Sequence, residues 1–567
     1  MSKRRALLGF AFGLFCCTLA VASNVLVVVL DDVGEDMFGV YRSNLGSPCA
    51  VGDLTDCPPT PTIDKLAKSG VTFLNYWTNP ICAATRSTIT FGRYGLRTGV
   101  VGPIGFPPDS ELAVPEILPL TFAPGVSTAM IGKWGLGNNG GPAAHGFGYE
   151  ATSNGGAAFI PNYCDWSKGE RGTFTPTHTY ATTENVRDAI AWIQEQGSQP
   201  WFLHLAFNAA HDPFHVPPDY GACPDVPLHS YSSFFPEPLP DQITQCENPP
   251  GSISACPQGF ESLCYRAMLQ AADTELGCLL SSINPKVLSA TTIIIVGDNG
   301  TPPGIDDPLA GPGRVKFSVS RGGIQVPLIV SGEQVKDPGT TSDTLVNASD
   351  IFATTTEILT GGPFSNFAPD KIYDSTSFLP TLNAVCSAER NWIFSQGQPV
   401  WRAIRDPHYK LMRKLGSPTC TVFYDLSTDP LERCPLVRDG TGCGAESAYI
   451  GPCDIPPPPC TGLCPAEPFQ DPCNQYPDCV RLRDEITALI ATAPQIEVDE
   501  SVCEHEGNQG CVPGTSFCAD AGIRCSFDGT CGLSGFCNST CVSDKECTEP
   551  DSLFPTEVGL VQHCSGG

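Results

Sequence analysis

Positive charge is scarce in this sequence. Its 567 residues include 32 lysines and arginines against 60 aspartates and glutamates, which gives a formal net charge of −28. A nucleic-acid binder neutralises phosphates with lysine and arginine, so this deficit excludes nucleic acid as a general partner. It also disfavours a surface built to attract long polyanions. The acidity is otherwise typical of a protein kept soluble by its charge.

Long apolar runs are missing after the first 22 residues. No later stretch approaches the roughly 18–20 apolar residues that cross a membrane, so we expect no transmembrane segment. Residues 1–22 combine a basic start, an apolar run from Ala6 to Val21 and small residues at the end. This is the pattern of a secretory signal peptide. The sequence therefore predicts a protein that is secreted, periplasmic or at the cell surface.

Cysteine, in contrast, is abundant, with 29 residues in the chain. In an exported protein this number predicts disulfide bonds. Removing Cys16 and Cys17 with the signal peptide leaves 27, so full pairing requires one exempt cysteine. We set aside Cys82, which lies four positions before Arg86. As a purely structural residue, Cys82 would be a buried free thiol or one half of a disulfide.

Alternating helices and apolar strands predict an α/β fold, with a central mixed, mostly parallel sheet sandwiched between helices. The unbroken apolar run at 25–30 is typical of a strand buried on both faces, and the largely apolar segments at 201–207 and 291–296 are expected to be further central strands. Helices are expected at 61–69 and 183–196. Each has glycine directly after its end, and the first has proline at its start.

Changes in composition divide the chain into further parts. A first domain is expected over residues 23–365, with a cysteine- and proline-rich, disulfide-braced insertion at 213–264. Shorter apolar pieces after residue 365 indicate a smaller C-terminal α+β subdomain over 366–496. Residues 497–567 hold nine cysteines and few large apolar side chains. We expect disulfide bonds, and not a hydrophobic core, to stabilise this disulfide-rich tail.

Polar pairs follow two of the expected buried strands. Asp31 and Asp32 come after the first, and Asp298 and Asn299 follow the strand at 291–296. The carboxyl ends of parallel strands share one edge of a sheet, where α/β proteins bind ligands. Three carboxylates and an amide oxygen form a set of hard oxygen ligands suited to Ca²⁺ or Mg²⁺. Each pair alone is also explained as a turn or a helix cap.

Further motifs accompany these pairs in a fixed order along the chain. They are Cys82-x-x-x-Arg86 with Gly92-Arg93, Gly132-Lys133-Trp134, Asn208-Ala-Ala-His211, Lys316 with Gly322-Gly323, and Phe423-Tyr-Asp-Leu-Ser-Thr-Asp-Pro430. Over roughly residues 24–440 the chain thereby resembles the type I sulfatases, the formylglycine-dependent arylsulfatase family of the alkaline phosphatase superfamily. The resemblance implies an alkaline phosphatase-like fold, with 23–365 as the catalytic domain.

The resemblance also implies a modified nucleophile. A formylglycine-generating enzyme would oxidise Cys82 to formylglycine before folding, and the hydrated aldehyde would supply the attacking oxygen. Modified Cys82 would be one ligand of a bound Ca²⁺ ion, or alternatively of Mg²⁺. The ion's other ligands would be Asp31, Asp32, Asp298 and Asn299.

The family's other site residues imply how a sulfate ester is held and cleaved. Arg86, Lys133 and Lys316 would clamp the sulfate oxygens, and His211 would donate a proton to the leaving alcohol or phenol. The implied substrate is a small aryl sulfate or a carbohydrate sulfate. Rim residues select among such substrates, and the insertion at 213–264 is expected to form part of that rim.

The motifs depart from the family pattern at four positions. Ala84 and Thr85 stand where proline and serine are commonest, and Arg321 stands where glutamate is usual. Gly135 replaces the histidine of Gly-Lys-Trp-His-Leu-Gly, which would hydrogen-bond the formylglycine hydroxyl. The candidates to take its place are His145, His178 and His215.

Two other functions remain open at this point. One is a phosphodiesterase or phosphonate monoester hydrolase of the same superfamily. Two-metal members need further histidine and aspartate ligands, and no Asp-x-x-x-His pair follows the insertion, which favours one metal. The other is a catalytically impaired, sulfatase-like binding protein, which Gly135 and the cysteine-rich tail favour.

Overall fold

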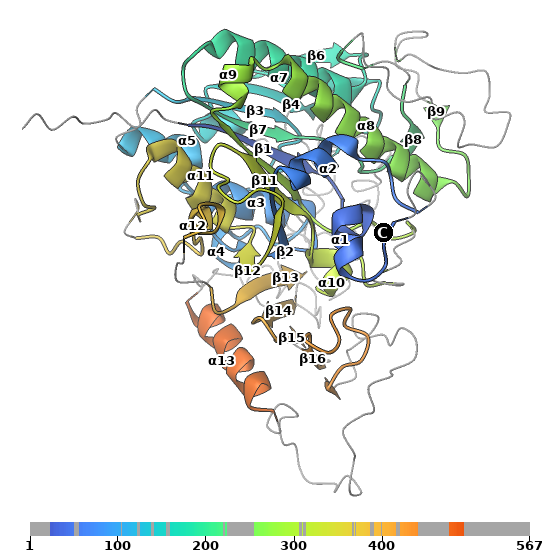
Figure 1. The fold of residues 1–567 in the computed structure, drawn as a ribbon, viewed down its shortest axis with the longest axis vertical. Coiled ribbons are helices and arrows are strands. Elements are labelled where there is room, and N and C mark those ends of the chain that lie inside the picture. Colours follow the sequence, from blue (N-terminus) through green and yellow to red (C-terminus); the bar gives the residue numbers. More distant parts are fainter. Residues whose placement is uncertain are drawn as a thin grey trace, which may run out of the picture.

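A ten-stranded sheet forms the centre of the protein, seen here in a computed structural model (Figure 1). The strand order is β12-β2-β11-β10-β1-β7-β3-β4-β5-β6. The structure describes residues 23–439 and 476–492, apart from 50–55, 104, 122–124, 138–140, 155–158, 219–220, 224–245, 247–253, 306–308, 310–312, 366–367, 369, 386–389, 398–399 and 416–419.

The middle of the sheet is parallel. β1 (Asn24–Leu30) lies between β10 (Thr291–Gly297) and β7 (Trp201–Ala206), and β7 pairs with β3 (Ser127–Gly132). Antiparallel neighbours enter further out, which confirms the mixed, mostly parallel sheet. The outer strands are β2 (Gly70–Trp77), β11 (Leu328–Gly332), β12 (Thr340–Asn347), β4 (Tyr149–Ser153), β5 (Trp166–Glu170) and β6 (Thr173–Thr177).

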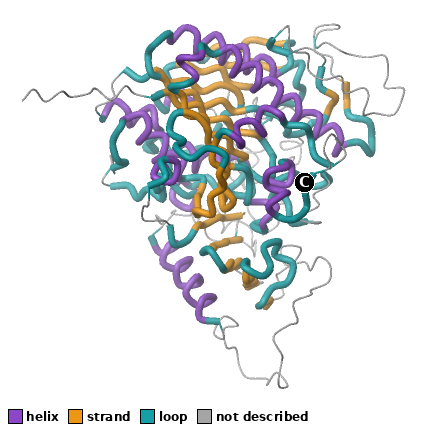
Figure 2. The backbone as a smooth tube through the Cα atoms, in the orientation of Figure 1, coloured by secondary structure: helices purple, strands orange, loops and turns teal. Residues whose placement is uncertain are grey.

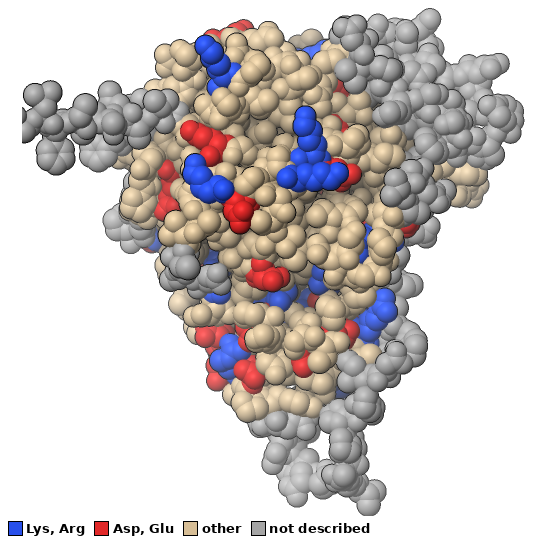
Figure 3. All heavy atoms as spheres, viewed as in Figure 1, with Lys and Arg blue, Asp and Glu red and all other residues tan. Residues whose placement is uncertain are grey.

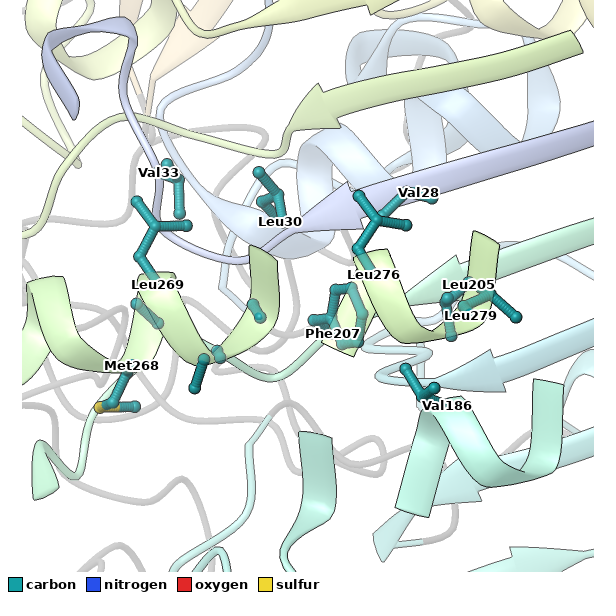
Figure 4. Close-up of a cluster of buried hydrophobic side chains, with 14 of the residues drawn as sticks. Val28, Leu30, Val33, Val186, Leu205, Phe207, Met268, Leu269, Leu276 and Leu279 are labelled. Carbon is teal, nitrogen blue, oxygen red and sulfur yellow. The ribbon is translucent and has the colours of Figure 1, made fainter. Parts of the chain in front are cut away.

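β1 shows why a central strand can be apolar without alternation. Its Val25, Val27 and Val29 face one core, and its Leu26, Val28 and Leu30 face the other. Because helices cover both faces of the sheet, every position of the strand is buried. Figure 4 shows one of these cores, in which the strands contribute Val28, Leu30 and Leu205, the position after β7 contributes Phe207, and the helices contribute Val186, Leu269, Leu276 and Leu279.

The helices form a layer on each side of the sheet, as Figure 2 shows. α2 (Pro61–Lys68), α7 (Ala181–Gln196) and α8 (Glu261–Ser282) supply one core. α3 (Cys82–Phe91), α5 (Val114–Ile117) and α11 (Asp350–Thr360) supply the other. The helices expected at 61–69 and 183–196 are α2 and α7. The short helices are η1 (Glu35–Met37), α1 (Gly39–Asn44), α4 (Gly95–Thr98), η2 (Leu118–Leu120), α6 (Gly141–Ala144), α9 (Pro285–Leu288), α10 (Arg321–Ile324) and α12 (Leu379–Leu382).

A second, smaller sheet follows in the lower part of Figure 1. Its five antiparallel strands are β13 (Ile393–Gly397), β14 (Trp401–Arg405), β15 (Tyr409–Lys414), β16 (Cys420–Asp425) and β17 (Val437–Asp439). α13 (Pro477–Ala491) packs on it through Leu482 and Ile486. This confirms the expected C-terminal α+β part of the fold, while the predicted tail at 497–567 lies outside the described residues.

Disulfides tie the predicted insertion to its surroundings. Within it, β8 (His215–Val216) pairs with β9 (Ser254–Ala255). Cys256 pairs with Cys264, but Cys223 and Cys246 pair outside the segment with Cys278 and Cys164. The bonds therefore anchor the insertion to α8 and to the loop before β5. A further bond joins Cys49 to Cys57, and Cys420, Cys434 and Cys479 are also disulfide-bonded.

Charged groups are scattered on the face of the molecule shown in Figure 3. Lysine and arginine side chains lie there singly or beside acidic ones, unlike the continuous basic stripe that tracks a nucleic-acid strand. Among the helices that the structure describes, none is both long and apolar enough to span a bilayer.

Candidate active site

The ends of two neighbouring strands bring the predicted acidic residues together. Asp31 and Asp32 follow β1, and Asp298 and Asn299 follow β10, its parallel partner. One oxygen from each of the three carboxylates lies within 4.8 Å of the others. Asn299 Nδ2 donates to Asp32 Oδ1 at 2.8 Å, and the Asp32 backbone N–H donates to Asp298 Oδ1 at 3.0 Å. All four residues are buried.

This oxygen set fits a divalent cation. Within the described part of the chain, Asp31 Oδ1 and Asn299 Oδ1 are buried without a hydrogen-bond partner. Asp31 Oδ1 has only a 3.5 Å ion pair with Arg86 Nη2. Buried polar atoms are normally paired, so these two oxygens beside two further carboxylates fit an additional positive partner. Ca²⁺ takes oxygen ligands at about 2.3–2.6 Å, and ligand atoms on such a shell lie at separations like those observed. Asp31, Asp32, Asp298 and Asn299 would hold the ion.

Three basic side chains face these carboxylates. Arg86 Nη2 lies 2.8 Å from Asp298 Oδ2, and Arg86 Nη1 donates to the Lys133 carbonyl at 2.6 Å. Lys133 Nζ lies 2.5 Å from Asp31 Oδ2. Lys316 Nζ lies 2.6 Å from Asp32 Oδ1. Three cations thus match three carboxylates, and a dication would make this centre net positive.

The surroundings shift the pKa values of Asp298 and Asp32 in opposite directions. Burial, and then the nearby Asp31 carboxylate, raise the pKa of Asp298 to about 6 despite Arg86. Burial alone would also raise the pKa of Asp32, but Lys316 and then His211 outweigh it, and the pKa lies well below its usual range. A cation at this centre would favour the ionised form of both carboxylates.

Cys82 is the first residue of α3 and is only 4% exposed. It is a free cysteine, while the insertion cysteines form disulfides. Burial raises the pKa of its thiol, although Lys133 and Lys316 partly oppose this. An unmodified Cys82 would therefore hold its proton at neutral pH, which makes it a weak nucleophile.

The residues that depart from the family pattern after Cys82 are accommodated in α3. Thr85 Oγ1 donates a hydrogen bond to the Asn79 carbonyl at 3.0 Å. The same oxygen accepts a hydrogen bond from the Asn79 backbone N–H, also at 3.0 Å. The hydroxyl of Thr85 thereby fastens the chain before the helix. Ala84 is fully buried beside Cys82. Neither substitution disturbs the placement of Cys82 at the helix start.

His211 lies at the outer side of the carboxylates, after β7. Its Nε2 lies 3.8 Å from Asp32 Oδ2, and its Nδ1 lies 2.9 Å from Asp212 Oδ1. Burial and the Lys133 charge lower the pKa of the His211 ring, whereas the carboxylates of Asp32 and Asp31 raise it. The net result is a raised pKa. The structure thus brings Cys82, Arg86, Lys133, His211 and Lys316 to one site.

None of the three histidines proposed to replace the family histidine contacts Cys82 among the described residues. His145 packs against Phe91 and Trp134, His178 lies on the surface beside Asp165, and His215 Nε2 lies 3.0 Å from Tyr180 Oη. Gly135 has φ +72°, and a Cβ there would lie 3.0 Å from Arg86 Cδ. Close packing of Arg86 therefore takes the space where a side chain at position 135 would begin.

This packing predicts that Gly135→Ala impairs the site. A side chain at positive φ costs about 1–2 kcal/mol, and the added methyl group also displaces Arg86. We expect kcat/KM to fall at least about tenfold, because small misplacements of positioning groups are costly.

Gly172→Ala is the matched control for Gly135→Ala, since Gly172 has φ +75° and no atom within 4 Å of an added Cβ. It should lose similar stability in thermal unfolding and keep full activity. Equal activity in the two variants would contradict the packing argument.

The positive charge of Arg321, which stands where the family usually has glutamate, is balanced by acidic neighbours. Its Nε lies 2.6 Å from Glu35 Oε1, and its backbone N–H donates to Glu432 Oε2 at 3.0 Å. Glu35 lies just beyond Asp31 and Asp32 on the same loop. The reversed charge is therefore balanced within the described structure by an acidic residue of the site loop.

Two residues near the site were not predicted from the sequence. Asp212 contacts His211, and the adjacency of an acidic residue to a candidate histidine was a usable signal. Tyr265, on α8, donates its hydroxyl to the Asp32 carbonyl at 2.8 Å. Nothing in the sequence around Tyr265 marks that contact, because the two residues meet only through the packing of α8 on the sheet.

Comparison with known proteins gives a consistent set of similarities. A family model described as Sulfatase matches residues 23–361, more than half of the chain. Arylsulfatase J of Mus musculus is 26% identical over 448 residues, which cover 70% of this chain and 64% of that protein. N-acetylgalactosamine-6-sulfatase of Homo sapiens is 28% identical over 228 residues, which cover 34% of this chain and 40% of that protein. The matched segments thus span less than two thirds of either relative.

The fold has counterparts among solved structures. The PsFucS1 sulfatase from Pseudoalteromonas sp. superimposes with a TM-score of 0.57 at 18% sequence identity. The match covers 83% of this chain and 90% of that one. At this level of identity, the similarity is evidence for a shared fold.

Proposed function

This chain belongs to the sulfatase family, and on that premise we propose that it hydrolyses sulfate monoesters of phenols or sugars with a formylglycine made from Cys82. The observation that carries the proposal is the convergence of Arg86, Lys133 and Lys316 with the buried acidic residues around one free cysteine. A cysteine among so many charges has little value for packing. It suits a reactive group held against an anion.

The basic residues would bind the sulfate. A lysine ammonium has three N–H donors, and Lys133 uses one of them on Asp31. The remaining donors are free to contact sulfate oxygens and to offset the charge that develops during transfer. Arg86 is held from two sides, by Asp298 and by the Lys133 carbonyl, so its guanidinium is fixed before the substrate arrives. A bound Ca²⁺ or Mg²⁺ would add positive charge beside the sulfate.

His211 would protonate the leaving group. The contact between its Nδ1 and Asp212 fixes the ring, and Nε2 then faces the carboxylate centre. A proton on Nε2 would pass to the departing alcohol or phenol oxygen as its bond to sulfur breaks. A raised pKa keeps that proton on the ring over a wider range of pH.

We also propose export from the cytosol and modification before folding. The disulfides in the described residues are typical of an oxidising compartment, which agrees with a signal peptide at 1–22. Cys82 is 4% exposed, so a formylglycine-generating enzyme would need to reach it in the unfolded chain. In this proposal 23–365 is the catalytic domain, with its insertion at 213–264. Residues 366–496 are the C-terminal subdomain, and 497–567 are a disulfide-stapled tail.

The test is sulfate release by protein made with the modifying enzyme. We expect turnover of para-nitrophenyl sulfate, its loss in EDTA and its recovery with Ca²⁺. Chelation should also lower the melting temperature by a few degrees, because a ligand at about 100 times its Kd stabilises by about 2.7 kcal/mol. That thermal readout does not depend on activity.

Asp298→Asn is the control for the cation, and its melting temperature should respond little to EDTA or Ca²⁺. Bis(para-nitrophenyl) phosphate tests the rival phosphodiesterase. Faster release from that diester than from the sulfate ester would contradict the proposal, as would a melting temperature and a turnover that chelation leaves unchanged.

A further inference from the structure

The side of the site where the leaving group departs is lined by an unusual trio. Phe159, His211 and Asp212 lie together there. The Phe159 and His211 rings are nearly parallel, at 4°, with centroids 6.5 Å apart. Asn154 Nδ2 donates to the Phe159 carbonyl at 3.3 Å, which helps to hold Phe159 in place. An aromatic ring therefore lies beside the proposed proton donor.

Asp212 adds a negative charge at the same place. Its side chain is 66% exposed, in contrast to the fully buried Asp31, Asp32 and Asp298. An exposed carboxylate is ionised at neutral pH. Its contact with His211 Nδ1 keeps it beside the path of the leaving group.

Among the described residues, the Asp212 charge is offset by the protonated ring of His211 and, less strongly, by Lys316. Residues 213–218, which follow Asp212, add no lysine or arginine. The base of the insertion at 213–264 is held near His211. Tyr163 Oη lies 2.8 Å from the His211 carbonyl, and the next residue, Cys164, is bonded to Cys246.

The cations of the site are already engaged deeper in the protein. Arg86, Lys133 and Lys316 all contact buried carboxylates, where they would serve the sulfate itself. A second anionic group on the substrate, placed toward His211, would meet the Asp212 carboxylate. This is the reverse of the arrangement that a highly charged sulfated polymer would require.

We propose that this site selects sulfate esters whose alcohol part is an uncharged ring, with Phe159 providing a face for the ring and Asp212 repelling substrates that carry a second negative charge. The inference rests on the proposed sulfatase activity. It narrows the expected substrates to compounds with a single sulfate group, esterified either to a phenol or to an otherwise neutral sugar.

The experiment compares para-carbamoylphenyl sulfate with para-carboxyphenyl sulfate, which are similar in size and differ in charge. The native protein should favour the carbamoyl ester. Asp212→Asn should raise the relative kcat/KM of the carboxy ester about three- to sevenfold at low salt, as expected for unit charges on the order of 7 Å apart in a partly aqueous medium. Differences between the two leaving groups that do not depend on Asp212 cancel, because the same pair is compared in each protein. Added salt should shrink the effect.

Asp484→Asn is the matched control, since Asp484 on α13 is also 66% exposed. It should leave the ratio unchanged. Phe159→Ala should raise KM for both esters and leave inhibition by inorganic sulfate unaltered.

Each result bears on a separate claim. If both esters are hydrolysed and Asp212→Asn leaves their ratio as in the native protein, the charge selection is wrong while the sulfatase activity stands. An unchanged KM in Phe159→Ala would overturn the role of the ring face. If the native protein hydrolyses neither ester nor para-nitrophenyl sulfate, the proposed function itself fails.

Discussion

Cys82→Ala is expected to reduce sulfate release by about ten-thousandfold or more, because it removes the group proposed to attack sulfur. Cys82 contributes little else, since it is free of disulfides and lies in a small cluster with Ile81 and Ala84. The melting temperature should therefore stay close to that of the native protein. Sulfate release and thermal unfolding, measured on the same preparation, separate loss of chemistry from loss of fold.

Cys82→Ser gives a sharper test of the aldehyde. A serine hydroxyl can accept sulfate, but it has no second hydroxyl whose collapse to an aldehyde would expel the sulfate. We expect one equivalent of product per protein and a sulfated peptide in mass spectrometry. Native protein should instead carry a carbonyl at position 82 that traps hydrazines. An alkylatable thiol there in active native protein, or full activity in Cys82→Ala, would defeat the proposed nucleophile.

The sequence was informative about the centre of the fold because the signal there is local. Strands buried on both faces, such as β1 and β10, carry runs of apolar residues, and the polar residues after their ends mark the edge where ligands bind. The strand order, the antiparallel β11 and the partners of Cys223 and Cys246 depend on contacts between distant segments. A single sequence carries no pattern that specifies such pairings.

The site shows the same division. Asp31, Asp32, Asp298 and Asn299 could be grouped because strand ends meet. The consequences of Gly135 and Arg321 could not be foreseen, because they depend on the path of the Arg86 side chain and on an ion pair with Glu35. The charge change at Arg321 is thus offset by a residue remote in the sequence, whereas none of His145, His178 and His215 takes the place of the histidine missing at Gly135.

Glu432 is the centre of a buried charge network that joins the smaller sheet to the site. Its Oε1 lies 2.6 Å from Lys410 Nζ on β15, and its Oε2 lies 3.0 Å from Arg314 Nη2. Oε2 also accepts the backbone N–H of Arg321, whose side chain pairs with Glu35 on the loop that carries Asp31 and Asp32. The smaller sheet therefore helps to position the loop of Asp31 and Asp32 through one carboxylate.

Glu432→Gln is expected to lower the free energy of unfolding by about 3–5 kcal/mol, because Lys410 and Arg314 would be left buried without a counter-charge. In thermal unfolding this corresponds to a fall in melting temperature on the order of 5–10 °C. Asp478→Asn is the control. Asp478 forms an exposed pair with Arg481, at 3.3 Å, and its loss should cost less than about 1 kcal/mol.

The pH dependence of the Glu432 effect gives a further test. Burial would raise the pKa of Glu432, but Lys410 and Arg314 outweigh it, and the net pKa is lowered from its usual value of 4.5. A carboxyl whose pKa is lowered by folding contributes stability above its unfolded pKa and loses it as the pH falls through the folded value. The gap in melting temperature between native protein and Glu432→Gln should therefore be full at neutral pH and should shrink as the pH falls below 4.5 and through the lowered pKa of the folded protein. A gap that stays constant into acid would mean that Glu432 acts through packing, and that its charge does not link the two sheets.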